Sequence, residues 1–146
     1  MDVLLRRAAR VLVIDEAGRV LLFRGGDPAR PEAGTWWFTP GGGIEGDESP
    51  VDAARRELRE ETGLVPTELA GPVYEQDIEF SFGGVLHRQH EHFFVVRTST
   101  FAVVDDGWTE LEREVMVESR WWSIEELRTS AEPFYPESLV ELIVRG

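Results

Sequence analysis

One stretch constrains the chain more than any other, the segment from Gly42 to Leu64 that reads GGIEGDESPVDAARRELREETGL. It places several carboxylates on one short helix directly after a glycine-rich turn. Glu57, Glu60 and Glu61 stand at positions i, i+3 and i+4, so they project from one flank of that helix. Like charges at this spacing destabilise an isolated helix. A hard divalent cation with oxygen ligands, Mg²⁺ or Mn²⁺, would compensate for the repulsion.

The ends of this helix are well marked in the sequence. Ser49 is the predicted N-cap, Pro50 the first helical residue, and Asp52 the carboxylate partner of a capping box. Gly63 supplies the left-handed residue that ends a helix. A helix is therefore expected over residues 50–62. Its apolar stripe, which would face the core, consists of Val51, Ala54 and Leu58.

The spacing of these residues resembles the Nudix box. Gly42 is followed after five residues by Glu48 and after seven more by Arg56-Glu57-Leu58, and the pattern is completed by Glu60-Glu61 and Gly63-Leu64. Every specified position fits, which is hard to obtain by chance. The resemblance implies a divalent-metal-dependent hydrolase that cleaves a pyrophosphate linkage in a nucleoside diphosphate joined to another group.

The resemblance also implies roles for individual residues. Glu57, Glu60 and Glu61 are the expected metal ligands, with the carbonyl of Gly42 as a backbone ligand, and Arg56 is expected to orient the carboxylates.

The general base is left open between a box glutamate and a carboxylate from a later loop. That loop offers Glu114 first, and then Glu112 and Glu110. Glu48 is expected to tie the glycine turn to the helix. The cofactor implied is Mg²⁺ or Mn²⁺, which would neutralise charge that develops on phosphorus.

Two residues before the box are candidates for substrate binding. Arg24, at the end of a predicted strand, could reach a phosphate or could be a solvated strand terminus. Trp37, in a run of three aromatic residues, could stack on a base or could belong to the core. The expected substrate is a nucleoside triphosphate or a nucleotide sugar. Phe80 stands where many ADP-ribose hydrolases have a proline.

Composition limits the partners. The 146 residues carry a formal net charge of −13, which argues against phosphate contacts to nucleic acid or to an anionic membrane. Cysteine is absent, so thiolate chemistry is excluded. Residues 1–15 contain arginines and too short an apolar run for a signal peptide or a membrane span. A cytoplasmic protein with a small nucleotide as partner is expected, and a homodimer is compatible with the sequence.

The pattern of the remaining chain favours an α+β fold in a single domain over residues 1–146. Strands and helices are separated by two predicted loops, residues 25–34 and 100–113. Strands are expected at 7–15, 20–23, 36–38, 68–82, 85–98 and 115–122, and further helices after Ser123 and over 136–144. The resemblance sharpens this to a Nudix-type α/β/α sandwich, a mixed sheet flanked by helices.

His90 and His92 should share one face of a strand, where two histidines can bind zinc. The sequence shows no third ligand, so a polar sheet face is the preferred interpretation.

Two alternatives to an active hydrolase remain. The same fold could bind a nucleotide as a sensor without turning it over, which loss of a box glutamate would favour; none is lost here. An interaction domain that uses the acidic surface would be indifferent to divalent metal.

Overall fold

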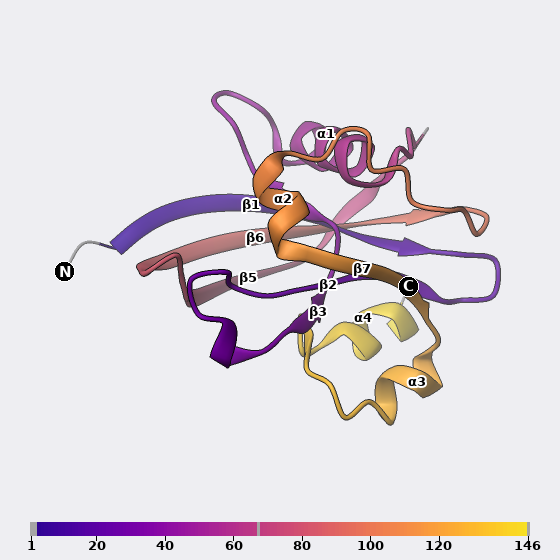
Figure 1. The fold of residues 1–146 in the computed structure, drawn as a ribbon. Helices are drawn as coiled ribbons and strands as arrows, with labels where there is room; N and C mark the ends of the chain where they lie inside the picture. Colours follow the sequence, from indigo (N-terminus) through magenta and orange to yellow (C-terminus); the bar gives the residue numbers. More distant parts are fainter. Residues whose placement is uncertain (1–2, 67, 146) are drawn as a thin grey trace.

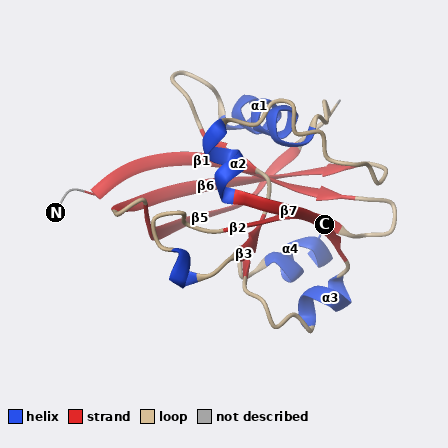
Figure 2. Cartoon of the chain, in the orientation of Figure 1, coloured by secondary structure: helices blue, strands red, loops and turns tan. Residues whose placement is uncertain are grey.

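The computed structural model describes residues 3–66 and 68–145, which form a curled mixed sheet between helices (Figure 1). Its strands are β1 (Val3–Ile14), β2 (Val20–Gly25), β3 (Trp36–Phe38), β4 (Gly41–Gly43), β5 (Ala70–Phe82), β6 (Val85–Arg97), β7 (Met116–Trp122) and β8 (Phe134–Tyr135). Its helices are α1 (Pro50–Thr62), α2 (Glu110–Val115), α3 (Ile124–Arg128) and α4 (Leu139–Arg145), with a 3₁₀ turn at Pro31–Ala33. Figure 2 shows α1 on one side of the strands and α3 and α4 on the other. This is the predicted α+β sandwich.

Strand β1 is the axis of the sheet. It pairs in parallel with β6 over its whole length, from Val3 opposite Leu86 to Ile14 opposite Arg97. Its other edge is shared between β4, which pairs antiparallel with residues 8–10, and β2, which pairs at Ile14. The glycine strand that precedes α1 is therefore fixed directly on the centre of the sheet.

Two apolar cores lie on the two faces of β1. Val11 and Val13 face α1, where they pack with Ala54 and Leu58. Leu12 and Ile14 face the opposite side; that core also contains Trp37, Trp122, Leu127, Leu139 and Leu142. A strand buried on both faces needs a continuous apolar run, which is why Val11 to Ile14 has no polar residue.

The predicted ends of α1 are confirmed. The Ser49 hydroxyl accepts a hydrogen bond from the Asp52 backbone N–H at 3.2 Å, and Pro50 is the first helical residue. Gly63 adopts φ +83° and its N–H donates to the Arg59 carbonyl at 2.9 Å. Among the described residues only this half of the predicted capping box is formed, since no bond from Asp52's carboxylate back to Ser49 is present.

Several predicted boundaries were wrong. β1 begins at Val3, because its pairing with β6 extends it beyond the apolar run.

The β5–β6 hairpin at Gly83-Gly84 is confirmed, and β5 is one long strand with an irregularity between Ala70 and Tyr74. α4 begins later than expected, at Leu139.

The largest difference is in the predicted loop 100–113. Its last residues belong to α2, which begins at Glu110. Thr109 and Glu112 form a complete capping box at its start, a signal that the sequence carries and that the loop prediction overlooked.

None of the described helices combines the length and the apolar character needed to cross a membrane.

The close packing at the end of α1 gives a testable stability difference. A Cβ on Gly63 would lie 2.9 Å from Val104 Cβ, whereas a Cβ on Gly18, at φ +77°, would meet nothing within 4 Å. Both alanine substitutions force a left-handed conformation, at about 1–2 kcal/mol. We expect Gly63→Ala to lower the free energy of unfolding by about 1 kcal/mol more than Gly18→Ala. Denaturant unfolding measures both, and equal losses would contradict tight packing of Val104 on the helix end.

Candidate active site

Two carboxylates of α1 are buried beneath the glycine strand β4. The Gly41 N–H donates to Glu61 Oε1 at 2.7 Å. A Cβ added to Gly42 would lie 2.6 Å from the Glu57 carboxylate, so only glycine lets this side chain approach the backbone there. Glu57 and Glu61 are 8% and 4% exposed, respectively. The glycine run is therefore a steric requirement of the carboxylate site.

These buried carboxylates have too little positive charge near them to compensate their own. It raises the pKa of Glu61 well above its usual range, and the nearby Glu57 carboxylate adds to the rise. Burial also raises the pKa of Glu57, whereas the neighbouring Arg56 guanidinium lowers it. A fully buried carboxylate is costly unless a cation or several donors compensate it. The donor set, all carboxylate oxygen, therefore fits a hard divalent cation.

Arg56 connects the helix to the glycine turn, the role for which the sequence suggested Glu48. Its Nε donates to Glu48 Oε2 at 2.7 Å and one terminal nitrogen donates to Glu48 Oε1 at 3.0 Å, which is a bidentate pair. That nitrogen also donates to the Gly43 carbonyl at 2.9 Å, and the other donates to Glu57 at 3.0 Å and Glu60 at 3.3 Å. The hydrogen bonds from Arg56 lower the pKa of Glu48 to about 2. One guanidinium thus fixes the turn and two box glutamates.

A third carboxylate joins the cluster from α2. Ligand oxygens of Glu57, Glu61 and Glu112 lie within 4.8 Å of one another. The segment before α2 is anchored on α1: Trp108 Nε1 donates to the Glu61 carbonyl at 2.7 Å, and a Cβ on Gly107 would lie 2.7 Å from the Glu60 carbonyl. This docking brings Glu112 to the box across a long sequence separation.

The structure places the other candidate acids differently from the sequence-based expectation. Glu114 is exposed and lies outside the cluster, because Glu112 occupies the inward position of α2. The later carboxylate that the structure brings to the box is therefore Glu112, whereas the sequence favoured Glu114. Glu60 is 36% exposed at its side chain, pairs with Arg56, and stands at the edge of the cluster rather than within it.

A pocket of about 600 Å³ opens beside the carboxylates. Glu61, Glu112 and Gly42 line one end of it. Its aromatic lining includes Trp36, Phe38, Phe80 and Phe82, and its polar lining includes Gln76, Gln89, Glu91 and Arg10. The pocket therefore combines carboxylates with aromatic side chains, the mixture of polar and apolar groups that is typical of small-molecule sites.

Neither predicted substrate-binding residue lines this pocket. Trp37 is 2% exposed and packs edge-on against Trp122 with ring centroids 5.0 Å apart, so it is a core residue and its assignment to stacking is corrected. Alternation along β3 turns its neighbours Trp36 and Phe38 to the pocket instead. Arg24 Nε donates to Glu118 at 2.6 Å and its terminal nitrogen to Thr35 at 3.1 Å, which accounts for Arg24 structurally.

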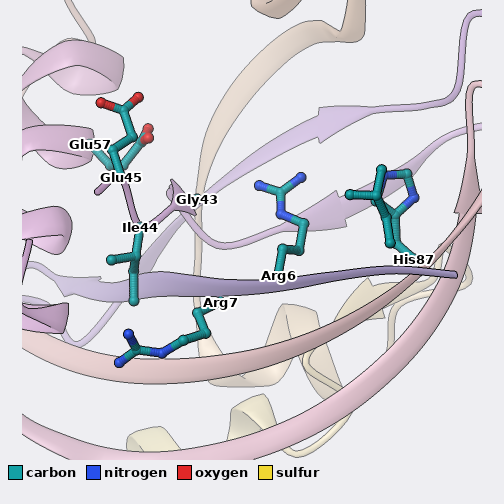
Figure 3. Close-up of a pocket in the computed structure, with 8 residues that line it drawn as sticks. Arg6, Arg7, Gly43, Ile44, Glu45, Glu57 and His87 are labelled. Carbon is teal, nitrogen blue, oxygen red and sulfur yellow. The ribbon is translucent and has the colours of Figure 1, made fainter. Parts of the chain in front are cut away.

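The sequence-based search missed Arg6. Figure 3 shows Arg6 and Arg7 leaving β1 on opposite sides, with the Arg6 guanidinium directed toward Gly43 and Glu57. Arg6 lines both the main pocket and an adjoining hollow of about 430 Å³. Among the described side chains it has no ion-pair partner, whereas Arg10 is held by Glu91 at 3.1 Å. The sequence carries a signal for it, because Arg6 and Arg10 are four residues apart in β1 and therefore lie on the same face of the strand.

The chain matches the family model described as NUDIX domain over residues 4–142. It is 33% identical over 132 residues to an RNA pyrophosphohydrolase of Acidiphilium cryptum, a match that covers 84% of this chain and 77% of the relative. The chain therefore belongs to the Nudix hydrolase family.

Solved structures share the fold. The MutT protein of Methanosarcina mazei Go1 superposes with a TM-score of 0.67 at 24% identity, over 99% of this chain and 94% of that one. The NUDIX domain of Shewanella oneidensis NrtR, complexed with ADP ribose, gives 0.68 at 18% identity, over 99% and 88%.

The buried carboxylates predict an unusual pH dependence in the presence of a chelator. Because the folded state raises the pKa of Glu61, the folded chain binds the proton more tightly than the unfolded chain, and this stabilising contribution is lost as pH rises above about 4.5. In EDTA we expect the stability of the wild type to fall more steeply with rising pH than that of Glu61→Gln, whose amide still accepts from Gly41.

Thermal unfolding measured from about pH 4.5 upward gives this slope. Glu114→Gln, a change of an exposed carboxylate, is the matched control and should follow the wild type. Parallel slopes for the wild type and Glu61→Gln would contradict an uncompensated charge at Glu61.

Proposed function

We propose that this chain is a cytoplasmic hydrolase, dependent on Mg²⁺ or Mn²⁺, that cleaves a pyrophosphate linkage in a nucleoside triphosphate or a nucleotide sugar. The observation that carries the proposal is the convergence of Glu57, Glu61 and Glu112, of which Glu61 and Glu112 also line the aromatic pocket. Family membership supports the reaction class, because divalent metal and pyrophosphate cleavage are typical of Nudix enzymes.

The box residues would hold the cation. Glu57, Glu61 and the Gly42 carbonyl are the proposed inner ligands, and Glu60 completes the set from the exposed edge. A bound divalent cation would neutralise charge on the phosphates and lower the pKa of a bound water. Arg56 keeps Glu57 and Glu60 oriented by donating to both. Its bidentate pair with Glu48 prevents the glycine turn from moving away from the helix.

Glu112 is the proposed general base. One of its oxygens accepts a hydrogen bond from the Thr109 N–H at 2.9 Å, which fixes the side chain at the start of α2. Its carboxylate reaches the cluster of Glu57 and Glu61, next to which an attacking water would lie. A positioned carboxylate that takes the proton from water contributes about 10²–10⁴-fold to the rate of such a reaction.

Other residues would bind the substrate. Arg6 offers a guanidinium to a phosphate oxygen, since it lies at the pocket and has no ion-pair partner among the described residues. Trp36 and Phe38 present faces on which a base can stack. Gln89 also lines the pocket; its Nε2 donates to Glu91 at 2.8 Å, and its buried Oε1 has no hydrogen-bond partner among the described residues.

Two alternative functions are distinguished by the experiment described below. The Acidiphilium relative bears the name RNA pyrophosphohydrolase, so a 5′-triphosphate RNA end is a second candidate substrate. The net charge of −13 disfavours the further phosphate contacts that RNA would need. A nucleotide sensor that binds without hydrolysis is the third reading.

The first experiment is a hydrolysis panel in Mg²⁺ and in Mn²⁺, with EDTA and Glu61→Gln as controls. The panel holds nucleoside triphosphates, nucleotide sugars, ADP-ribose, dinucleoside polyphosphates and a 5′-triphosphate RNA, with products identified by mass. Metal-dependent cleavage of a triphosphate or a nucleotide sugar, strongly reduced in Glu61→Gln, is the expected result. Tight nucleotide binding without cleavage of any compound would overturn the hydrolase in favour of the sensor.

Two carboxylates of α2 give a matched test of the base. Glutamine also serves in a capping box, so Glu112→Gln removes the charge and keeps the helix start. We expect its kcat to fall by about 10²–10⁴-fold with KM little changed, while exposed Glu114→Gln stays within about twofold of the wild type. Full activity of both variants would assign the base to the box, and a loss confined to Glu114→Gln would restore the sequence-based expectation.

A further inference from the structure

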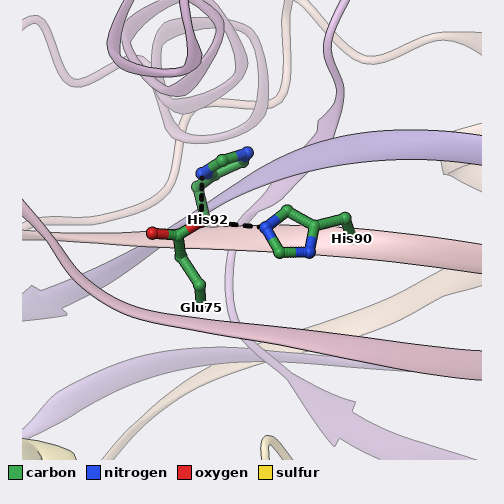
Figure 4. A group of neighbouring side chains, drawn as sticks. All are labelled: Glu75, His90 and His92. Atoms are coloured by element: carbon green, nitrogen blue, oxygen red, sulfur yellow. Dashed lines mark hydrogen bonds and ion pairs between the residues drawn. The ribbon is translucent and has the colours of Figure 1, made fainter.

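A second cluster of ligand groups lies on the strand pair β5–β6. The sequence places His90 and His92 on one face without a third ligand; the structure supplies Glu75 from β5, opposite His92 in the register. Figure 4 shows the carboxylate of Glu75 meeting both imidazoles. The pocket side of the same strands carries Gln76 and Glu91, so the cluster lies on the opposite face from the pocket.

The ligand atoms converge on one point. Glu75 Oε1 lies 2.8 Å from His90 Nε2 and 3.2 Å from His92 Nδ1. The two rings are nearly perpendicular, at 78°, with centroids 4.8 Å apart, and the three ligand atoms lie within 4.8 Å of one another. Ligands on a tetrahedral zinc ion at about 2.0–2.1 Å are roughly 3.3 Å apart. Small side-chain adjustments therefore suffice to surround such an ion.

A fourth residue orients the site. His90 Nδ1 lies 2.8 Å from Asp77 Oδ1, and since a carboxylate only accepts, the ring donates this hydrogen bond. The bond fixes the ring with Nε2 toward Glu75. A carboxylate that accepts from the far nitrogen of a histidine is the usual outer support of a zinc ligand. Arg7, which pairs with His90 in the register of β1, is the neighbouring cation on this face.

We propose that Glu75, His90 and His92 form a transition-metal site, filled by Zn²⁺, that fastens β5 to β6 on the face opposite the nucleotide pocket. Two imidazoles and one carboxylate favour zinc over magnesium, in contrast to the all-oxygen ligands of the box. Three protein ligands leave the fourth position to water. The site is independent of the proposed hydrolysis, because none of its ligands lines the pocket.

Occupation of the site would stiffen a wall of the pocket. Gln76 Nε2 donates to Glu91 Oε1 at 2.9 Å on the pocket face, and each of these residues adjoins a ligand in sequence. A cation that joins the two strands on one face restrains their separation on the other. A ligand that binds only the folded chain also raises its thermal stability.

Direct metal counting tests the proposal. Chelator-treated, full-length protein is dialysed against Zn²⁺ in excess Mg²⁺, and the bound metal is measured by mass spectrometry. We expect about one zinc per chain in the wild type and in Glu61→Gln, which disables the box but not this site. His90→Gln, His92→Gln and Glu75→Gln should bind zinc at least about tenfold more weakly. His87→Gln removes the remaining histidine, which lines the pocket, and should retain the ion.

Two controls test whether the variants still fold and whether the bound metal has the proposed coordination. Glu75 and His90 are partly exposed, so their variants should keep the fold, which far-ultraviolet circular dichroism checks. Replacement of zinc by Co²⁺ should give the visible absorption of a nitrogen-containing tetrahedral site in the wild type and not in Glu75→Gln. Absence of zinc in the wild type would overturn the proposal. So would loss of zinc in Glu61→Gln, or full retention of zinc by the three ligand variants.

Discussion

The burial of two like charges beneath a glycine strand is the constraint on which the rest of this molecule depends. Glu57 and Glu61 lie where water cannot solvate them, and their pKa values rise accordingly. Gly41 and Gly42 allow the approach because they have no side chains. Such an arrangement is unfavourable by itself, so the surrounding structure supports it: β4 is fixed on β1, and Arg56 holds one glutamate from outside.

Two segments of the chain form the site, the box and the segment that carries Glu112, and they are anchored to the fold in different ways. The box is local in sequence, capped at both ends and packed on a core of β1. Glu112 arrives from a separate segment that is attached through Trp108 and the close approach of Gly107 to α1. Trp108 also packs edge-on against Phe23 of β2, so this anchor touches helix and sheet together. The placement of the outer carboxylate thus depends on the contacts that Trp108 and Gly107 make with α1.

The local features were predictable, and the tertiary ones were not. Caps and glycine ends obey short-range rules, so α1 could be bounded from its sequence. Which of three adjacent aromatic rings faces a pocket depends on the phase of β3 against its partners, and this phase turned Trp37 into the core. Position along the loop favours Glu114, but α2 turns Glu112 toward the box, and this depends on where the helix begins. The third ligand near His90 and His92 comes from a strand whose register no local pattern reveals.

The parallel pairing of β1 with β6 has a consequence for the order in which the chain can acquire its structure. These strands bring together residues far apart in sequence, such as Arg10 and Glu91, which are 81 positions apart and form a hydrogen bond. Loop closure over that distance must occur before the pairing contributes any stability. The platform under β4 is therefore completed late, after β6 has been synthesised. A ribosome-bound chain that has emerged only as far as Leu64 contains every residue of the box and all of β1, but none of β6, with which β1 pairs over its whole length.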